Sequence, residues 1–373
     1  MTASRSNVYT INFGPHHPST HGVLRLKLTM SGEEVIACEP ITGYLHRGIE
    51  KIVEGKKFIS VIPYVDRLDY LSPAIQEHAY VIAIEKLLGA QATERAIFIR
   101  AIFDELTRIS SHIMSIGSMT FDLGCLSLLL YGVEEREKIM SVFEETTGAR
   151  MHLAYYAPGG VFCDLSESVI EKIKAFIEGI GFYLDAVEKL AINNRIFIKR
   201  TVGIGKIVAE EAIANGVSGV NVRASGNAKD VRVSAPYGAY ALLGFNPIVL
   251  HEGDCHARFR LRFLEIKQSM ELIKRCLGIL PSGNYRNDEC AKRLTIRGLP
   301  RNSVVCASTE TPRGEFGIRM EVGDDSHHVH KMSFQSPSFA HVQFLRKLLV
   351  GVTIPDITAI LGSVDFIMGC CDR

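Results

Sequence analysis

The sequence lacks the features that mark several common protein classes. Its 42 Lys and Arg residues are balanced by 41 Asp and Glu, so no excess of one charge attracts nucleic acid. No run approaches the roughly 18 uninterrupted apolar residues of a membrane span, and residues 1–5 carry no apolar signal segment. We therefore expect no nucleic-acid partner, no membrane span and no secretory signal, in a chain made in a reducing compartment.

Paired cysteine spacings and glycine-rich phosphate loops are also missing. None of the nine cysteines stands in a C-x-x-C pair, which argues against a zinc ribbon or a disulfide scaffold. We expect mostly buried free thiols, although the adjacent Cys370 and Cys371 leave a strained redox pair open. Gly203-Ile-Gly205-Lys206 lacks the third glycine and the acidic partner of a dinucleotide fingerprint, so we expect a turn there and no NAD bound by this chain.

The segments that are present alternate in a way that predicts an α+β fold. Period-two patterns favour strands at residues 8–13, 22–30 and 35–38, and again at 303–307, 314–322 and 328–334. Helical spacing favours helices at 72–88, from Thr93 past Ile116, at 134–147, 166–193 and 253–277, and from Pro355. Ser72 and Thr93 are predicted N-caps, and residues 281–302 are predicted to be a polar loop.

These segments form three regions without a clear domain boundary. They are an N-terminal β region of about residues 6–60, a helical core of about 72–280 and a C-terminal mixed region of about 300–373. Because strands stand at both ends of the chain, we expect one α+β unit, residues 1–373, whose two ends meet. The 47% of apolar residues suggests that partner surfaces cover part of it.

Histidines are concentrated at residues 14–22, where His16, His17 and His21 lie among prolines and glycines. These prolines and glycines exclude a helix, so His17 and His21 are not an i,i+4 metal pair. Neutral imidazole both donates and accepts protons near pH 7, which is useful chemistry for a ligand site. The alternative is a loop whose imidazoles bond to its own backbone.

Three further polar groups stand out. Arg47 keeps its charge at any working pH, so it raises the potential of a nearby redox centre, holds a carboxylate or forms a surface ion pair with Glu50. Tyr70 follows alternating charges and either donates to a carbonyl-type ligand or simply reaches solvent. Asp122 is an acid among apolar residues, so we expect it to orient a donor such as a histidine.

Together these stretches resemble one family, the D-type subunits of NADH-quinone oxidoreductase, or respiratory complex I. The matching motifs occur in order along nearly the whole chain. They are Asn12-Phe-Gly-Pro-His-His-Pro-Ser-Thr-His-Gly-Val-Leu-Arg-Leu26, Gly43-Tyr-Leu-His-Arg-Gly-Ile-Glu-Lys51, Pro63-Tyr-Val-Asp-Arg-Leu-Asp-Tyr70, Glu85-Lys-Leu-Leu-Gly89, Thr147-Gly-Ala-Arg-Met-His152 and Gly362-Ser-Val-Asp365.

The resemblance implies a role for each polar cluster. It implies that His21 and Tyr70 bind a quinone head group and that Asp122 pairs with the histidine. It also implies that His17 and Met114 line the same pocket, and that Arg47 and His152 lie beside a [4Fe–4S] cluster held by a neighbouring subunit. No metal and no cofactor is expected on this chain itself.

The same family is related to the large subunits of [NiFe]-hydrogenases, which implies a hydrogenase-like fold with a central helical bundle. Hydrogenases hold their metals with two C-x-x-C pairs. Here the corresponding positions read Tyr44-Leu-His-Arg-Gly48 and Asp365-Phe-Ile-Met-Gly-Cys-Cys-Asp-Arg373. The resemblance therefore implies that hydrogen chemistry is lost and that quinone takes the vacated metal cavity.

The expected activity is that of a proton-translocating NADH:quinone reductase, with quinone as substrate and with FMN and NADH in partner subunits. The implied partners are the iron–sulfur subunit of B type, the C- and I-type subunits and a membrane subunit of H type. The expected location is peripheral, on the cytoplasmic side of a bacterial inner membrane or the matrix side of a mitochondrial one.

Some positions depart from the family pattern. Ala157 stands where an Arg is usual and Leu128 where a Pro is usual, and Cys370-Cys371 replaces Glu-Val. The interval 281–303 is shorter than usual and is expected to lack a helix that the family commonly has. These departures leave two alternatives open, a non-catalytic structural or assembly copy and a subunit of a related ferredoxin- or hydrogen-linked membrane oxidoreductase.

Overall fold

The computed structural model describes residues 8–17 and 22–373. The chain starts with an antiparallel sheet of β1 (Val8–Phe13), β2 (Arg25–Ser31) and β3 (Glu34–Ile41), in that order. Leu26, Leu28 and Met30 alternate along β2 and are fully buried, as expected of a sheet with one solvent face. The predicted turn between β2 and β3 is confirmed, because Ser31 pairs with Glu34.

Short helical segments connect this sheet to the first long helix. They are α1 (Ile49–Ile52), η2 (Phe58–Val61) and α2 (Ile62–Val65), and they lead to α3 (Pro73–Leu88). Pro73 occupies the first turn of α3 and Gly89, at φ 58°, ends it, as predicted. Ser72 stands at the N-cap position, as predicted, but its side chain makes no capping bond, because its hydroxyl donates to Asp69 Oδ2 at 2.5 Å and closes the preceding turn.

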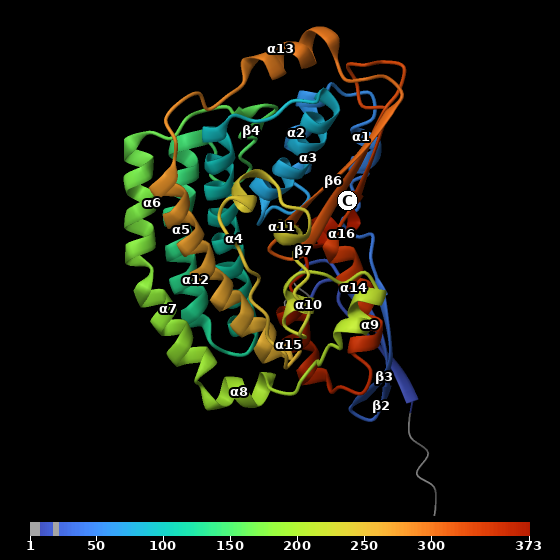
Figure 1. The fold of residues 1–373 in the computed structure, drawn as a ribbon. Coiled ribbons are helices and arrows are strands. Elements are labelled where there is room, and N and C mark those ends of the chain that lie inside the picture. The colour runs from blue at the N-terminus through green and yellow to red at the C-terminus, as the bar shows by residue number, and fades with distance from the viewer. Residues whose placement is uncertain (1–7, 18–21) are drawn as a thin grey trace, which may run out of the picture.

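A helical bundle forms the middle of the molecule (Figure 1). Its central helix is α4 (Glu94–Asp122), which packs against α5 (Leu126–Thr147) and α12 (Cys255–Ile279), while α6 (Glu167–Gly179) and α7 (Gly181–Val187) cover α5. The Thr93 cap is confirmed, since its hydroxyl accepts the N–H of Ala96. The predicted start of α5 at residue 134 is wrong, because the helix already begins at Leu126 and buries Leu128 completely.

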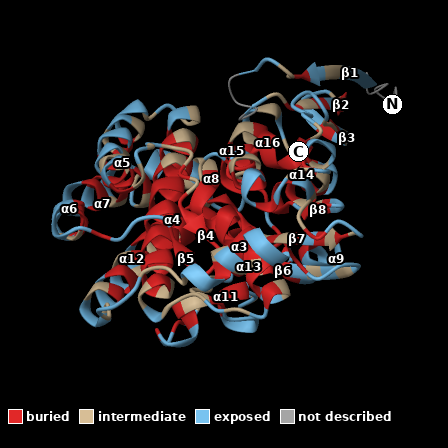
Figure 2. Ribbon diagram, turned by 90° about the horizontal axis from the view of Figure 1, so that it is seen from above, coloured by how far each residue is buried: buried red, intermediate tan, exposed pale blue. Residues whose placement is uncertain are grey.

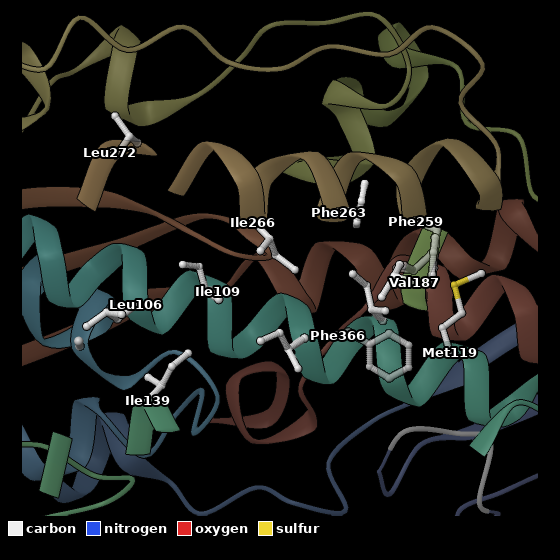
Figure 3. Packing of buried hydrophobic residues seen from close by; sticks show 14 of the residues in the cluster. Leu106, Ile109, Met119, Ile139, Val187, Phe259, Phe263, Ile266, Leu272 and Phe366 are labelled. Atoms are coloured by element: carbon white, nitrogen blue, oxygen red, sulfur yellow. The ribbon is translucent and has the colours of Figure 1, made fainter. Parts of the chain in front are cut away.

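The bundle core is apolar where α4 faces its neighbours. In Figure 3, Leu106 and Ile109 of α4 lie between Ile266 of α12 and Ile139 of α5, and all four side chains are fully buried. Each such side chain contributes roughly 1.5–3 kcal/mol by its removal from water. Buried residues are concentrated in α3 and α4, as Figure 2 shows, so these two helices form a rigid support for the turns at their ends.

Short elements connect the long helices. They are β4 (Tyr156–Ala157), β5 (Gly160–Val161), η3 (Glu188–Ile192), α8 (Arg195–Thr201), α9 (Ala209–Ala214), α10 (Val220–Arg223), α11 (Val231–Ser234) and η4 (Gly238–Ala241). The stretch 217–240, predicted to be irregular, thus contains three short helical turns. Residues 203–205 form a turn, as predicted.

The C-terminal part holds a second antiparallel sheet of β6 (Ser303–Thr311), β7 (Gly314–Val322) and β8 (Lys331–Gln335), followed by α14 (Pro337–Leu348), α15 (Ile354–Val364) and α16 (Met368–Asp372). The prediction of a loop without a helix at 281–302 is wrong, because α13 (Asp288–Arg297) lies there. Asn287 caps it, and its buried Cys290 and Leu294 anchor it. Helix α14 was not predicted either.

The two ends of the chain meet, as expected. The backbone N–H of Val35 donates to Val352 at 3.0 Å, and that of Arg47 donates to Arg373 at 2.9 Å. The molecule is therefore a mixed helix-and-sheet protein of the predicted α+β class. Among the described residues, no helix combines the length and the apolar character that crossing a bilayer requires.

Candidate functional site

The turn between α2 and α3, residues 66–72, is the centre of the candidate site. It contains the buried Asp69, whose Oδ1 accepts the N–H of Leu71 at 3.1 Å, while Gln76 on α3 accepts the N–H of Asp69 at 3.0 Å. These bonds fix the turn against the first helical turn of α3. The next residue, Tyr70, is 37% exposed and therefore accessible from outside the chain.

A buried arginine attaches this turn to the C-terminal region. Arg313, from the β6–β7 hairpin, donates to Asp69 Oδ2 at 2.8 Å and to Asp365 Oδ1 at 3.4 Å. It also donates to Ser111 on α4 at 3.1 Å. Burial opposes the charge of Arg313, but Asp365 and Asp69 hold its pKa above the ordinary value. Three distant segments thus converge next to Tyr70.

The chemistry of Tyr70 follows from this environment. Burial raises the pKa of its phenol, and the charges of Arg313 and Arg136 oppose that shift only in part. The phenol therefore keeps its proton at neutral pH and is a hydrogen-bond donor. Arg136 belongs to α5, and its Nε donates to the Ser110 hydroxyl on α4 at 3.1 Å, so Tyr70 lies close to the α4–α5 pair.

Met114 and Asp122 lie further along α4. Met114 is half-buried one turn beyond Ser110, on the same helix face. Asp122 is the last residue of the helix, about 12 Å beyond Met114 along its axis. His17 is exposed and its ring lies 4.2 Å from that of Phe13, centroid to centroid.

His21 lies outside the described residues, so its predicted contacts with Asp122 and with a quinone stay predictions. The structure does describe the residue that follows it, Gly22, which enters β2 next to α16. A Cβ at Gly22 would lie 3.1 Å from Met368 Cγ. Gly22, at the end of the histidine loop, therefore lies against the C-terminal helix.

Arg47 is bound to both the α2–α3 turn and α16. Its guanidinium donates to the Arg67 carbonyl at 3.1 Å and to the Gly369 carbonyl at 2.7 Å. The alternative surface ion pair between Arg47 and Glu50 is not formed, because Glu50 accepts the N–H of Phe334 at 2.8 Å and pairs with Arg373 at 3.4 Å. Arg47 itself stays exposed beside the turn.

His152 reaches the same turn from the segment between α5 and β4. Burial and the nearby positive charge of Arg67 lower the pKa of its imidazole, although a hydrogen bond to the backbone of Asp66 opposes the shift. His152 is therefore neutral at pH 7. The structure thus brings Arg47 and His152 to two consecutive residues of one turn, Asp66 and Arg67, three to four residues before Tyr70.

The two segments that correspond to the missing C-x-x-C pairs lie side by side. The N–H of Leu45 donates to Asp372 Oδ2 at 2.9 Å, and His46 Nδ1 lies 2.7 Å from the Asp372 carbonyl. All nine cysteines are free, as expected, and five of them are buried. Burial raises the pKa of Cys370 to about 12, so this thiol stays protonated. Among the described residues, no three His, Cys, Asp or Glu side chains are grouped to hold a metal ion.

Several residues of the site were not predicted from the sequence. Arg313 stands in Pro312-Arg313-Gly314, a pattern that indicates only a hairpin turn. Asp365 belonged to a matching motif but had no assigned role. Asp66 had no assigned role either; it is fully buried and pairs with Arg67.

Comparisons with known proteins agree on one family. The family described as "Respiratory-chain NADH dehydrogenase, 49 Kd subunit" matches residues 122–305 and 296–373. The D-type subunit of NADH-quinone oxidoreductase from Wolbachia pipientis wMel is 40% identical over 97% of this chain and 98% of its own length. That from Paramagnetospirillum magneticum is 40% identical over the whole of both chains. The NADH-ubiquinone oxidoreductase 49 kDa subunit of Cafeteria roenbergensis is 38% identical over 98% of this chain and 96% of its own length.

Proposed function

The chain belongs to the family of the 49 kDa subunit of respiratory-chain NADH dehydrogenase, and on this premise we propose that it is the quinone-binding subunit of a proton-translocating NADH:quinone oxidoreductase. In this proposal it forms the quinone chamber together with a B-type iron–sulfur subunit. Subunits of C and I types and an H-type membrane subunit are its other neighbours, and FMN and NADH bind elsewhere in the complex. It lies peripherally on the cytoplasmic or matrix side of the membrane.

The proposal rests on one observation: the turn at residues 66–72 has two roles. At one end of the turn, Arg47 and His152 contact Asp66 and Arg67, and the positive charges of Arg47 and Arg67 suit a surface facing a negatively charged cluster on a partner. At the other end, Tyr70 presents a protonated phenol. A single rigid turn thus supports the electron-delivering edge and the quinone-binding donor.

The mechanism follows from what these side chains hold and donate. Reducing a quinone to a quinol takes two electrons and two protons, and the electrons would come from the cluster that the partner subunit would hold. In the proposal, Tyr70 and His21 donate to the two quinone carbonyl oxygens, and Asp122 stabilises the imidazolium form of His21 before its proton transfer. Arg313 and Asp69 keep Tyr70 in place, and His17 and Met114 contact the head group.

The hydrogenase-like relationship is part of the same proposal. The segments at residues 44–48 and 365–373 touch through Leu45 and Asp372, as two halves of a former metal site would. Their thiols are the buried Cys370 and Cys371, which stay protonated because burial raises the pKa of both. This supports a site that has changed from metal chemistry to binding an organic ligand.

Replacing Tyr70 by Phe in the assembled complex tests the proposal. We expect quinone reduction to fall at least about tenfold, because the general acid is lost, while reduction of an artificial acceptor that takes its electrons before the chamber is unchanged. Tyr64→Phe on α2 is the matched control and leaves both rates unchanged. The proposal is contradicted if the Tyr70 variant loses both activities equally, or if it loses neither of them. Genetic complementation tests the alternative of a non-catalytic assembly copy. That alternative predicts no quinone-linked NADH oxidation in a strain in which this chain is the only copy of the subunit.

A further inference from the structure

Two buried carboxyls lie beneath the Arg47 and His152 surface and have no role in the mechanism above. We propose that Asp66 and Glu77 form a proton-binding site, in which the pair holds one proton near neutral pH. The site lies directly behind Arg67. Coupling of this proton to electron transfer rests on the proposed function, whereas the proton-binding site itself does not.

The geometry shows two acids with too few partners for two negative charges. Both side chains are completely buried, Asp66 after the last turn of α2 and Glu77 in the first half of α3. Glu77 Oε2 accepts the N–H groups of Tyr155 at 2.8 Å and Tyr156 at 3.1 Å. Asp66 Oδ1 accepts from Arg67 at 3.0 Å. The second oxygen of each carboxyl, Asp66 Oδ2 and Glu77 Oε1, has no hydrogen-bond partner within the described part of the chain.

The surrounding charges do not neutralise the pair. Arg67 is the cation beside Asp66, but its side chain is 47% exposed and shared with solvent, so it compensates a buried charge poorly. A hydrogen bond from the backbone of Ala154 favours the ionised form of each carboxyl by lowering its pKa, whereas the negative charge of Asp66 raises the pKa of Glu77. The groups that face the pair from the packed elements are Arg67, His152, Tyr155 and Tyr156, with Asp104, His78 and Arg100 behind the Tyr156 ring.

The hydrogen-bond donors deeper in the core are already used by other acids. Arg100 donates to both oxygens of Glu85, at 2.7 and 3.2 Å, and His78 is bound to Asp104 at 2.7 Å. A buried carboxylate without a compensating charge takes up a proton instead, and the negative charge of a nearby carboxylate strengthens this tendency. In agreement with this geometry, burial raises the pKa of Asp66 to about 7 and that of Glu77 to about 8. Around pH 7.5 the proton resides mainly on Glu77.

The pair of Asp66 and Glu77 lies close enough to the Arg47 and His152 surface to respond to charge there, which links it to the proposed function. Asp66 is bound to Arg67, whose carbonyl holds Arg47, and Asp66 also contacts His152 through its backbone. A negative charge arriving on a partner cluster at this surface stabilises the protonated form of the pair. The pair therefore gains proton occupancy when the cluster is reduced and loses it on reoxidation.

Infrared spectroscopy of the assembled complex tests the site, because a protonated carboxyl has a carbonyl stretch that is separate from carboxylate bands. We expect such a band near pH 7, which decreases as the pH rises through about 8. Glu77→Gln removes at least half of it at pH 7.5. The matched control Glu85→Gln, also on α3 but paired with Arg100, leaves the band unchanged.

A second variant keeps the test decisive if Glu77→Gln does not fold. Asp66→Asn removes the like charge next to Glu77, so the remaining band must titrate at lower pH than in the wild type. Identical spectra of wild type and the Glu77 variant, or an unshifted titration in the Asp66 variant, overturn the shared site. A band that is present but insensitive to cluster reduction overturns the coupling to the proposed function and leaves the proton site intact.

Discussion

Replacing Arg313 by Met removes a buried cation that contacts both Asp69 and Asp365, at 2.8 and 3.4 Å. Removing one partner of a buried ion pair costs about 3–5 kcal/mol, because the remaining charge has lost both water and its partner. Asp365 also lies 3.8 Å from Arg262, so most of the loss arises at Asp69. We therefore expect the free energy of unfolding to fall by about 3 kcal/mol.

Urea unfolding of the full chain in a double-mutant cycle measures the direct interaction. Asp69→Asn alone leaves Arg313 with Asp365, whereas the double variant with Arg313→Met leaves no unpaired charge at Asp69. We expect the double variant to be at least about 1 kcal/mol more stable than the sum of the two single effects predicts. Effects that add to within about 0.5 kcal/mol refute the reasoning, because independent sites behave in that way.

Three further predictions follow from other parts of the structure. Because the pKa of Glu77 is raised to about 8, the folded chain binds a proton that the unfolded chain has released, so the free energy of unfolding must fall between about pH 5 and about pH 8 by up to about 1.4 kcal/mol per pH unit. We expect Glu77→Gln to flatten this slope when urea unfolding is measured at several pH values. An unchanged slope contradicts the shifted pKa. Thr93→Ala removes the cap of α4 and lowers the urea-derived stability by about 1 kcal/mol, which an unchanged midpoint would refute. Gly219→Ala places a Cβ against the Arg313 carbonyl oxygen at φ 70° and lowers the thermal midpoint far more than Gly244→Ala, where φ is 60° but the space is open. Equal shifts of the two midpoints argue against the close docking of the hairpin.

The helices that could be predicted from the sequence have local start and stop signals. Pro73 and Gly89 delimit α3, and Thr93 and Asp254 accept backbone N–H groups at the starts of α4 and α12. These signals lie within a few residues of the ends that they determine. The strands at 314–322 and in the N-terminal hairpin follow equally local alternation.

The elements that were missed depend on contacts with distant parts of the chain. Helix α13 has a local start signal, because Asn287 caps it and Asp288 and Glu289 stand in its first turn. Only Cys290 and Leu294 are buried within it, so its apolar pattern is weak and does not stand out from a polar loop. The first turns of α5 lack a polar cap, since Cys125 makes no side-chain capping bond, and their helical state is favoured by packing against distant parts of the chain.

The same distinction applies to the candidate site. Tyr70, Arg47 and His152 were identified because they stand in recognisable motifs. The partner that positions Tyr70 could not be found in this way, because Arg313 is 244 residues from Asp69 in the chain. The burial of Asp66 was equally hidden, since burial is a property of the packed α2–α3 turn rather than of its sequence.

A map of the assembled complex with bound quinone tests the central claim most directly. The account predicts that one carbonyl oxygen of the head group lies within hydrogen-bond distance of the Tyr70 hydroxyl, about 2.5–3.0 Å. It also predicts that the head group lies on the side of the α2–α3 turn opposite to Arg47 and His152. A head group that occupies the complex without touching Tyr70 would contradict it.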